Sequence, residues 1–190
     1  MRYMLQAESA KRRISYILLG VGCLLMVVRA FYGLDLTDES FYLAVTKRFL
    51  EGDGLFQEEW FTTQLIGILL LPLYWLHGQI YGSQEGIILF VRLCYVAFSG
   101  GVACFLFHEL EKRMDWRAAL SASLLYLFYV RANIPTLSYY SIGLGTFLIF
   151  LLLRKKTCIR IAGLCAGISF AVSVLCMPYM VLYFLLLVIW

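Results

Sequence analysis

Apolar runs recur along nearly the whole chain, and this pattern constrains the fold more than any other feature. The runs cover residues 14–31, 86–107, 118–130, 141–153, 161–176 and 181–190. Hydrophobic residues make up 62% of the chain and charged residues only 15%, unlike an ordinary soluble domain. We therefore predict an all-α polytopic membrane protein, a single domain over residues 1–190 with about six transmembrane helices.

Basic residues predict the orientation of the first run. Four of them precede it, namely Arg2, Lys11, Arg12 and Arg13. No small-residue cleavage site follows promptly, so residues 14–31 are predicted to be a signal anchor with a cytoplasmic N-terminus in the plasma membrane. Residues 33–81 then form a large acidic outer loop, and residues 86–190 contain the remaining spans.

Residues 62–81 admit two topologies. If this segment spans the membrane, every later helix is reversed. If it does not, the cytoplasmic segments hold eleven Lys and Arg residues and four acids, whereas the outer segments hold five and eight. The second arrangement follows the positive-inside rule, and Pro72, Trp75 and His77 suit a helix at the membrane interface. We therefore assign residues 62–81 to an interfacial helix of the outer loop.

The outer loop concentrates acidic residues. Seven of the twelve acids of the chain lie in it, at Asp35, Asp38, Glu39, Glu51, Asp53, Glu58 and Glu59. Thr37 or Asp38 suits an N-cap, and Phe41, Val45 and Phe49 recur at helical spacing before Gly52, which predicts a short amphipathic helix. A carboxylate at such an N-terminus either caps the helix or accepts a proton from a reacting group.

Three basic residues in or near the loop, Lys47, Arg48 and Arg92, also have two interpretations each. Lys47 and Arg48 suit either a substrate phosphate or lipid headgroups. Arg92 lies about two turns into the next apolar run, where a charge is costly and is usually functional or paired with an acid. Arg131 begins a second outer loop, residues 131–140.

Several short motifs occur in a distinctive combination. Asp38-Glu39 is followed by Tyr42 and then by Gly52-Asp53, and residues 85–93 open the next apolar run with an arginine. A Lys-Arg turn precedes the third span, and residues 137–141 read Leu-Ser-Tyr-Tyr-Ser. Together with the signal anchor, these features resemble the GT-C glycosyltransferases, the polytopic enzymes that use polyprenyl-phosphate sugars. Protein O-mannosyltransferases and aminoarabinose transferases are members.

The resemblance implies roles for individual residues. It makes Asp38 the general base with Glu39 beside it, and Glu59 or Glu58 a part of the donor-phosphate site. The other predicted substrate-binding residues are Gln64, Lys47, Arg92, Arg131, Ser138 and Tyr139. The implied partners are the bilayer, a polyprenyl-phosphate-linked sugar donor and a glycan, lipid or protein acceptor.

Two departures from the family pattern qualify this interpretation. Members commonly carry an acid in the second outer loop, but residues 131–140 contain none, which argues against a bridging divalent metal. No metal or other cofactor is therefore predicted. Family members also usually have eight or more spans, so we expect this chain to be the N-terminal portion of a longer protein.

Other functions stay open. The net charge of +4 comes mainly from residues flanking apolar runs, so a nucleic-acid partner is not expected. A transporter or flippase for lipid-linked glycans would carry charges deep in several helices and internal repeats, and no repeat is visible. An assembly subunit would dock through a small-residue surface such as the GxxxG motif of Gly163 and Gly167.

Overall fold

The computed structural model describes residues 2–33, 38–57, 61–133, 135–154 and 160–189. Within these ranges all regular secondary structure is helical, which confirms the all-α prediction. The helices are α1 (Arg2–Ala30), α2 (Asp38–Glu51), α3 (Leu65–Tyr81), α4 (Ile87–Leu110), α5 (Trp116–Phe128), α6 (Tyr139–Leu153), α7 (Arg160–Cys176) and α8 (Met180–Ile189). Short 3-10 helices cover Thr62–Gln64 and Arg131–Asn133.

Two helices are long and apolar enough to cross a membrane. They are α1, over Ser9–Ala30, and α4. Helices α3, α6 and α7 are apolar but shorter, and α5 and α8 have only 13 and 10 residues. At 1.5 Å per residue, α5 covers about 20 Å of a hydrocarbon core about 30 Å thick. The described part of the chain thus contains two clear candidate spans, and the prediction of about six is not confirmed.

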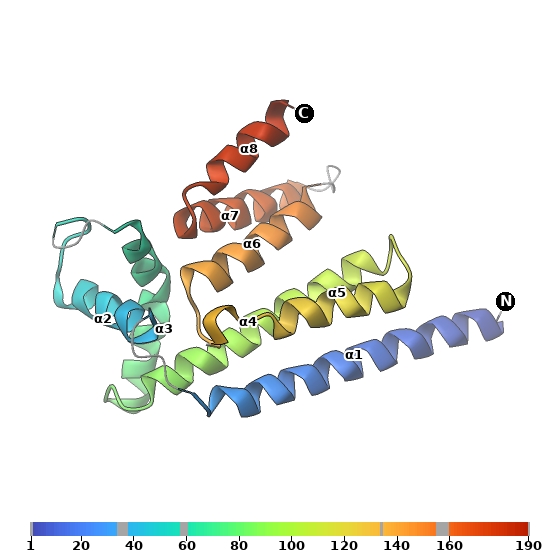
Figure 1. Cartoon of the computed structure of the whole chain (residues 1–190), viewed down its shortest axis with the longest axis horizontal. Coiled ribbons are helices and arrows are strands. Elements are labelled where there is room, and N and C mark those ends of the chain that lie inside the picture. The colour runs from blue at the N-terminus through green and yellow to red at the C-terminus, as the bar shows by residue number, and fades with distance from the viewer. Residues whose placement is uncertain (1, 34–37, 58–60, 134, 155–159, 190) are drawn as a thin grey trace.

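Helices α1 and α4 lie side by side and antiparallel. Near the start of α4, Arg92 donates a hydrogen bond to the carbonyl of Ala30 at the end of α1. At the other end, Arg12 of α1 donates to Glu111, which follows α4. The chain therefore leaves α1 and enters α4 at the same end of this pair, and α2 and α3 both lie at that end (Figure 1).

The remaining helices continue this back-and-forth arrangement. Helix α5 packs along α4 and α1, and α6 and α7 form a further antiparallel pair beside α4 (Figure 1). We call the end that carries α2, α3 and residues 129–138 the loop end, and the opposite end the N-terminal end. The α4–α5 turn and the ends of α6 and α7 that residues 155–159 connect lie at the N-terminal end. The sequence also predicts that these two sets of connections lie at opposite ends of the helices. The side of the membrane that each end faces stays a prediction.

Glycines allow the closest approaches between the helices. A Cβ atom on Gly100 would lie 2.8 Å from the sulfur of Cys23, and one on Gly145 would lie 2.7 Å from the Phe98 ring. By contrast, a Cβ atom on Gly163 or Gly167 would meet no described atom within 4 Å. The GxxxG motif of α7 therefore faces away from the described helices, whereas Gly100 and Gly145 serve the bundle packing that small residues favour.

The short helix predicted after Asp38 is confirmed as α2. It begins at Asp38, buries Tyr42 and Val45, and ends before Gly52, whose φ of +105° suits glycine. Helix α3 packs against it closely, because a Cβ atom on Gly67 would lie 2.9 Å from the Phe49 ring. Helices α2 and α3 thus form one unit at the loop end.

Candidate functional site

A buried ion pair lies where α2 meets α4. Arg92 Nε donates to Glu39 Oε1 at 2.8 Å, and Arg92 Nη2 donates to Glu39 Oε2 at 2.6 Å. Only 5% of the Arg92 side chain and 1% of the Glu39 side chain are exposed. This parallel arrangement is the bidentate geometry that gives arginine–carboxylate pairs their strength.

The third nitrogen of Arg92 binds the end of α1. Nη1 donates to the carbonyl of Gly33 at 2.9 Å and to that of Ala30 at 3.1 Å. Carbonyls beyond the last turn of a helix lack helical partners and carry the negative end of the helix dipole, so a guanidinium suits this position. One side chain therefore joins α1, α2 and α4.

These contacts decide between the two interpretations of Arg92. The arginine is paired with Glu39 of α2, an acid of the predicted outer loop, and its charge is neutralised inside the protein. Of the two predicted catalytic residues, Glu39 is this partner. Asp38 is the first residue of α2, but its side chain lies outside what the structure describes. The predicted donor-site residues Glu58 and Glu59 also lie outside the described residues.

The other charged loop residues with described side chains, and Gln64, have partners within the loop. Lys47 pairs with Glu51 at 3.6 Å, and Arg48 pairs with Asp53 at 2.6 Å. Gln64 is buried; it donates to the carbonyl of Phe61 and accepts from the N–H of Phe56, both at 3.0 Å. Gln64 thus closes the segment between α2 and α3, and Lys47 lies in a partly exposed ion pair.

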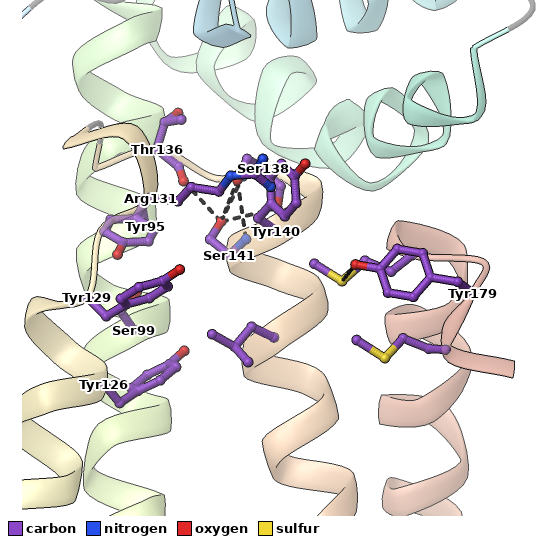
Figure 2. Close-up of a pocket in the computed structure, with 13 residues that line it drawn as sticks. Tyr95, Ser99, Tyr126, Tyr129, Arg131, Thr136, Ser138, Tyr140, Ser141 and Tyr179 are labelled. Carbon is purple, nitrogen blue, oxygen red and sulfur yellow. Dashed lines mark hydrogen bonds between the residues drawn. The ribbon is translucent and has the colours of Figure 1, made fainter. Parts of the chain in front are cut away.

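A cavity of about 340 Å³ opens at the loop end, within the usual size range of ligand pockets (Figure 2). It lies between α4 and α5 on one side and α6 and the start of α8 on the other. Its lining residues are Tyr95, Ser99, Tyr126, Tyr129, Arg131, Thr136, Ser138, Tyr140, Ser141, Leu144, Met177, Tyr179 and Met180.

Hydroxyl groups dominate the chemistry of this cavity. Tyrosine, serine and threonine supply most of its polar atoms, and these groups both donate and accept hydrogen bonds. Arg131 contributes a cation whose guanidinium lies over the Tyr140 ring. The lining residues include no carboxylate, and Leu144, Met177 and Met180 add apolar surface. The cavity therefore suits a neutral or anionic polyhydroxy compound better than a cation.

The start of α6 forms the rim of the cavity. Ser138 Oγ accepts from the Ser141 N–H at 3.2 Å, and Ser141 Oγ accepts from the Ser138 N–H at 2.8 Å, which makes a reciprocal cap. Tyr139 faces α2, where its ring meets the Tyr42 ring edge-on at 6.0 Å between centroids. Ser138 thus lines the cavity while it caps α6, and Tyr139 links that rim to α2.

The sequence predictions located part of this cavity. Of the predicted substrate-binding residues, Arg131 and Ser138 line it. Sequence reasoning missed the tyrosines and the serine that α4 and α5 contribute, because they lie inside apolar runs. Their spacing carried a usable signal: Tyr95 and Ser99 are four residues apart and Tyr126 and Tyr129 three, so each pair shares one helical face.

No metal centre is found among the described side chains, where no three His, Cys, Asp or Glu residues are grouped to hold an ion. No family model matches this chain, and no curated protein or solved structure matches it. Any functional conclusion therefore depends on the sequence motifs and on the geometry of the loop end.

Proposed function

We propose that the chain is a GT-C-like membrane glycosyltransferase. It would move a sugar from a polyprenyl-phosphate donor to an acceptor on the outer face of the membrane. One observation carries this proposal: the Asp38-Glu39 motif begins a short helix that Arg92 anchors at the loop end. Tyr42 of that helix contacts Tyr139 at the rim of the tyrosine-lined cavity.

The proposal includes a polytopic topology with the N-terminal end in the cytoplasm. The antiparallel arrangement of α1 and α4 supports a non-spanning α3, because the chain enters and leaves the α2–α3 unit at one end. Large apolar side chains are widely exposed on α1, α7 and α8, for example Leu24, Leu164 and Leu186. A surface of this kind is suited to lipid rather than to water.

In the proposed reaction Asp38 is the general base. Its carboxylate accepts the proton of an acceptor hydroxyl or amine as that oxygen or nitrogen attacks the anomeric carbon of the donor sugar. The bond between the anomeric carbon and the phosphate oxygen breaks, polyprenyl phosphate leaves with the bonding electrons, and the configuration inverts. Glu39 is assigned a positioning role, because its carboxylate is bound to Arg92.

The cavity is the proposed site for the sugar end of a substrate. Its hydroxyl groups match the hydrogen-bonding groups of a sugar ring, and its aromatic rings offer flat apolar surfaces to the C–H faces of that ring. Arg131 is the basic group that we assign to the departing phosphate, since Arg92 is paired with Glu39. The isoprenoid chain of the donor would stay in the hydrocarbon region.

The test is sugar transfer by the full-length protein in proteoliposomes, measured with a panel of polyprenyl-phosphate sugars. Asp38→Asn is expected to lower the transfer rate by about 100-fold to 10,000-fold, the usual contribution of a general base. Glu51→Gln is the matched control, because it removes a loop carboxylate that lies in an exposed ion pair. Unchanged transfer by Asp38→Asn would exclude Asp38 as the base.

A second candidate function, an assembly subunit, is favoured by the uncovered GxxxG face of α7. A subunit of this kind would lose association with its partner when Gly167 is replaced by leucine. The activity of the partner would then fall in proportion to the amount of complex. Asp38→Asn would change neither the amount of complex nor the partner's activity. The two candidates therefore respond to different substitutions.

A further inference from the structure

A recess of about 710 Å³ lies at the N-terminal end, far from the acidic loop along the bundle. We call it the basic recess. Lys11, Arg12 and Arg13 of α1 form one wall, and Lys112 of the α4–α5 turn and Trp116 at the start of α5 form the other. Two acids, Glu111 and Asp115, also line it.

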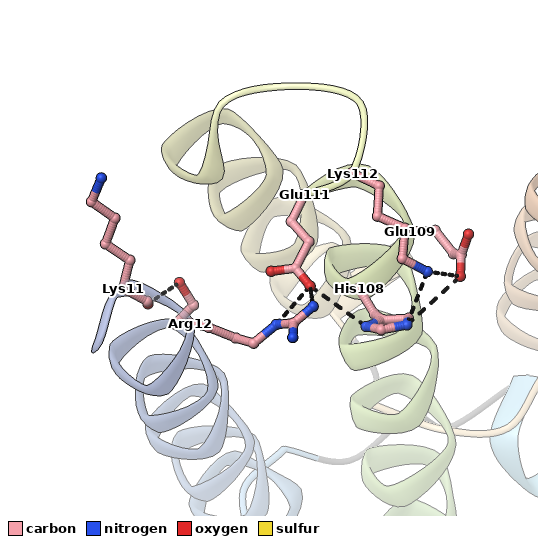
Figure 3. A network of polar contacts seen from close by, with 7 residues as sticks. Lys11, Arg12, His108, Glu109, Glu111 and Lys112 are labelled. Atoms are coloured by element: carbon pink, nitrogen blue, oxygen red, sulfur yellow. Dashed lines mark hydrogen bonds and ion pairs between the residues drawn. The ribbon is translucent and has the colours of Figure 1, made fainter. Parts of the chain in front are cut away.

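The acids of this region are already engaged. Arg12 Nε donates to Glu111 at 2.8 Å, and the Lys112 ammonium lies 2.9 Å from Glu109 (Figure 3). The Asp115 carboxylate accepts from the N–H of Arg117, as the N-cap of α5. These contacts neutralise Arg12 and Lys112 within the protein.

Lys11 and Arg13 differ from their neighbours. Among the described side chains, no carboxylate lies within 4.0 Å of either of them. Their two positive charges are therefore available to a ligand at the edge of the recess. A ligand that matches them carries a negative charge and several hydrogen-bond acceptors, as a phosphate group does.

An apolar stripe continues from Arg13 along α1. Ile17, Val21, Leu24 and Val28 recur three or four residues apart, so they share the helix face of Arg13. All four side chains are exposed, Ile17 to 64% and Leu24 to 66%. A cationic group above a long apolar surface matches a molecule with a charged head and a hydrocarbon tail. Trp116 adds the aromatic side chain that is common at the membrane interface.

We propose that the basic recess binds the phosphate headgroup of an anionic phospholipid. Arg13, at the head of the stripe, binds the phosphate, and Lys11, on the other flank of Arg12, adds positive charge at the edge of the recess. An acyl chain lies along the stripe from Ile17 to Val28. A free phosphate shares the charge of this ligand but gains nothing from the stripe. The proposal concerns the opposite end of the bundle from Asp38 and does not depend on sugar transfer.

The experiment measures binding of phosphatidylglycerol by the full chain in a neutral detergent. Lys11→Gln together with Arg13→Gln is expected to weaken binding about thirtyfold, because each basic residue contributes about 1 kcal/mol and 1.4 kcal/mol is tenfold. Arg154→Gln together with Arg160→Gln is the matched control. It removes the same charge at the same end of the bundle, outside the recess, and should change binding less than twofold.

Further measurements distinguish a lipid headgroup from free phosphate, and loss of binding from loss of folding. Inorganic phosphate should not compete with phosphatidylglycerol, and Ile17→Gln with Val21→Gln should weaken lipid binding. Lys11→Arg with Arg13→Lys keeps both charges and should retain binding, which shows that the site tolerates exchange without unfolding. Equal losses in the recess variant and its control would overturn the proposal, as would competition by inorganic phosphate at concentrations near that of the lipid.

Discussion

Arg92 is the residue on which the arrangement of the loop end depends. Burying an arginine and a carboxylate costs several kcal/mol per ion, and only good geometry with additional hydrogen bonds offsets that cost. The Glu39–Arg92 pair satisfies both conditions. It is bidentate, and Nη1, the remaining guanidinium nitrogen of Arg92, donates to carbonyls at the end of α1. Removing either partner would leave an uncompensated charge in an apolar environment.

We therefore expect Glu39→Gln and Arg92→Met each to lower the free energy of unfolding by about 3–5 kcal/mol. The double variant should lose less than the sum, because it removes both charges. Equilibrium unfolding in mixed detergent micelles measures all three losses. Glu51→Gln breaks an exposed pair and should cost less than about 1 kcal/mol. A loss for Glu39→Gln no larger than this control would contradict the buried-pair assignment.

At the scale of the helices, small residues determine how closely the elements approach. Gly145 of α6 meets the Phe98 ring of α4 and the Tyr126 hydroxyl of α5, so three helices converge at one glycine. The Ser173 hydroxyl of α7 donates to the carbonyl of Gly143 at 3.1 Å, which adds a fourth helix to this region. Helix α6 thus joins α7 to α4 and α5.

A methyl group at Gly145 should disturb this packing. We expect Gly145→Ala to lower the free energy of unfolding by about 1–3 kcal/mol, because the rings of Phe98 and Tyr126 must move to admit it. Gly163→Ala is the matched control in α7, where nothing described lies within 4 Å. It should be neutral or stabilising by up to about 1 kcal/mol, since alanine is the better helix former. Equal effects of the two substitutions would contradict the described packing.

The sequence predicted the helices better than it predicted their contacts. The predicted apolar run at residues 141–153 corresponds to α6 (Tyr139–Leu153). The predicted N-cap and the apolar spacing after Asp38 correspond to α2. Such signals are local, so they can be read along the chain. The partner of Arg92 could not be read in this way, because Glu39 is 53 residues away and several other loop acids carry the same charge.

At the scale of the whole molecule, polar contacts concentrate at the two ends of an apolar bundle. The loop end contains the Glu39–Arg92 pair and the tyrosine-lined cavity, and the N-terminal end contains the Arg12–Glu111 contact and the basic recess. The cavity was beyond sequence prediction as a unit, because its lining comes from four helices, the loop between α5 and α6 and the turn between α7 and α8. Of its lining residues, the sequence analysis identified Arg131 and Ser138 as substrate-binding.

The two ends should face opposite sides of the membrane. In a chain whose six native cysteines are replaced, Gln79→Cys should react with an impermeant maleimide added outside intact cells. Lys112→Cys should react only after the membrane is opened, because it lies at the end that carries the N-terminus. Labelling of Lys112→Cys from the outside would contradict the proposed topology and would make α3 a span.

The Glu39–Arg92 pair also bears on the orientation of α4 in a membrane. In the proposed orientation Arg92 lies toward the outer end of α4, where its charge opposes the positive-inside preference. Pairing with Glu39 removes the net charge that the arginine would otherwise bring into the hydrocarbon region. The pair therefore makes this orientation of α4 less costly than the arginine alone would make it.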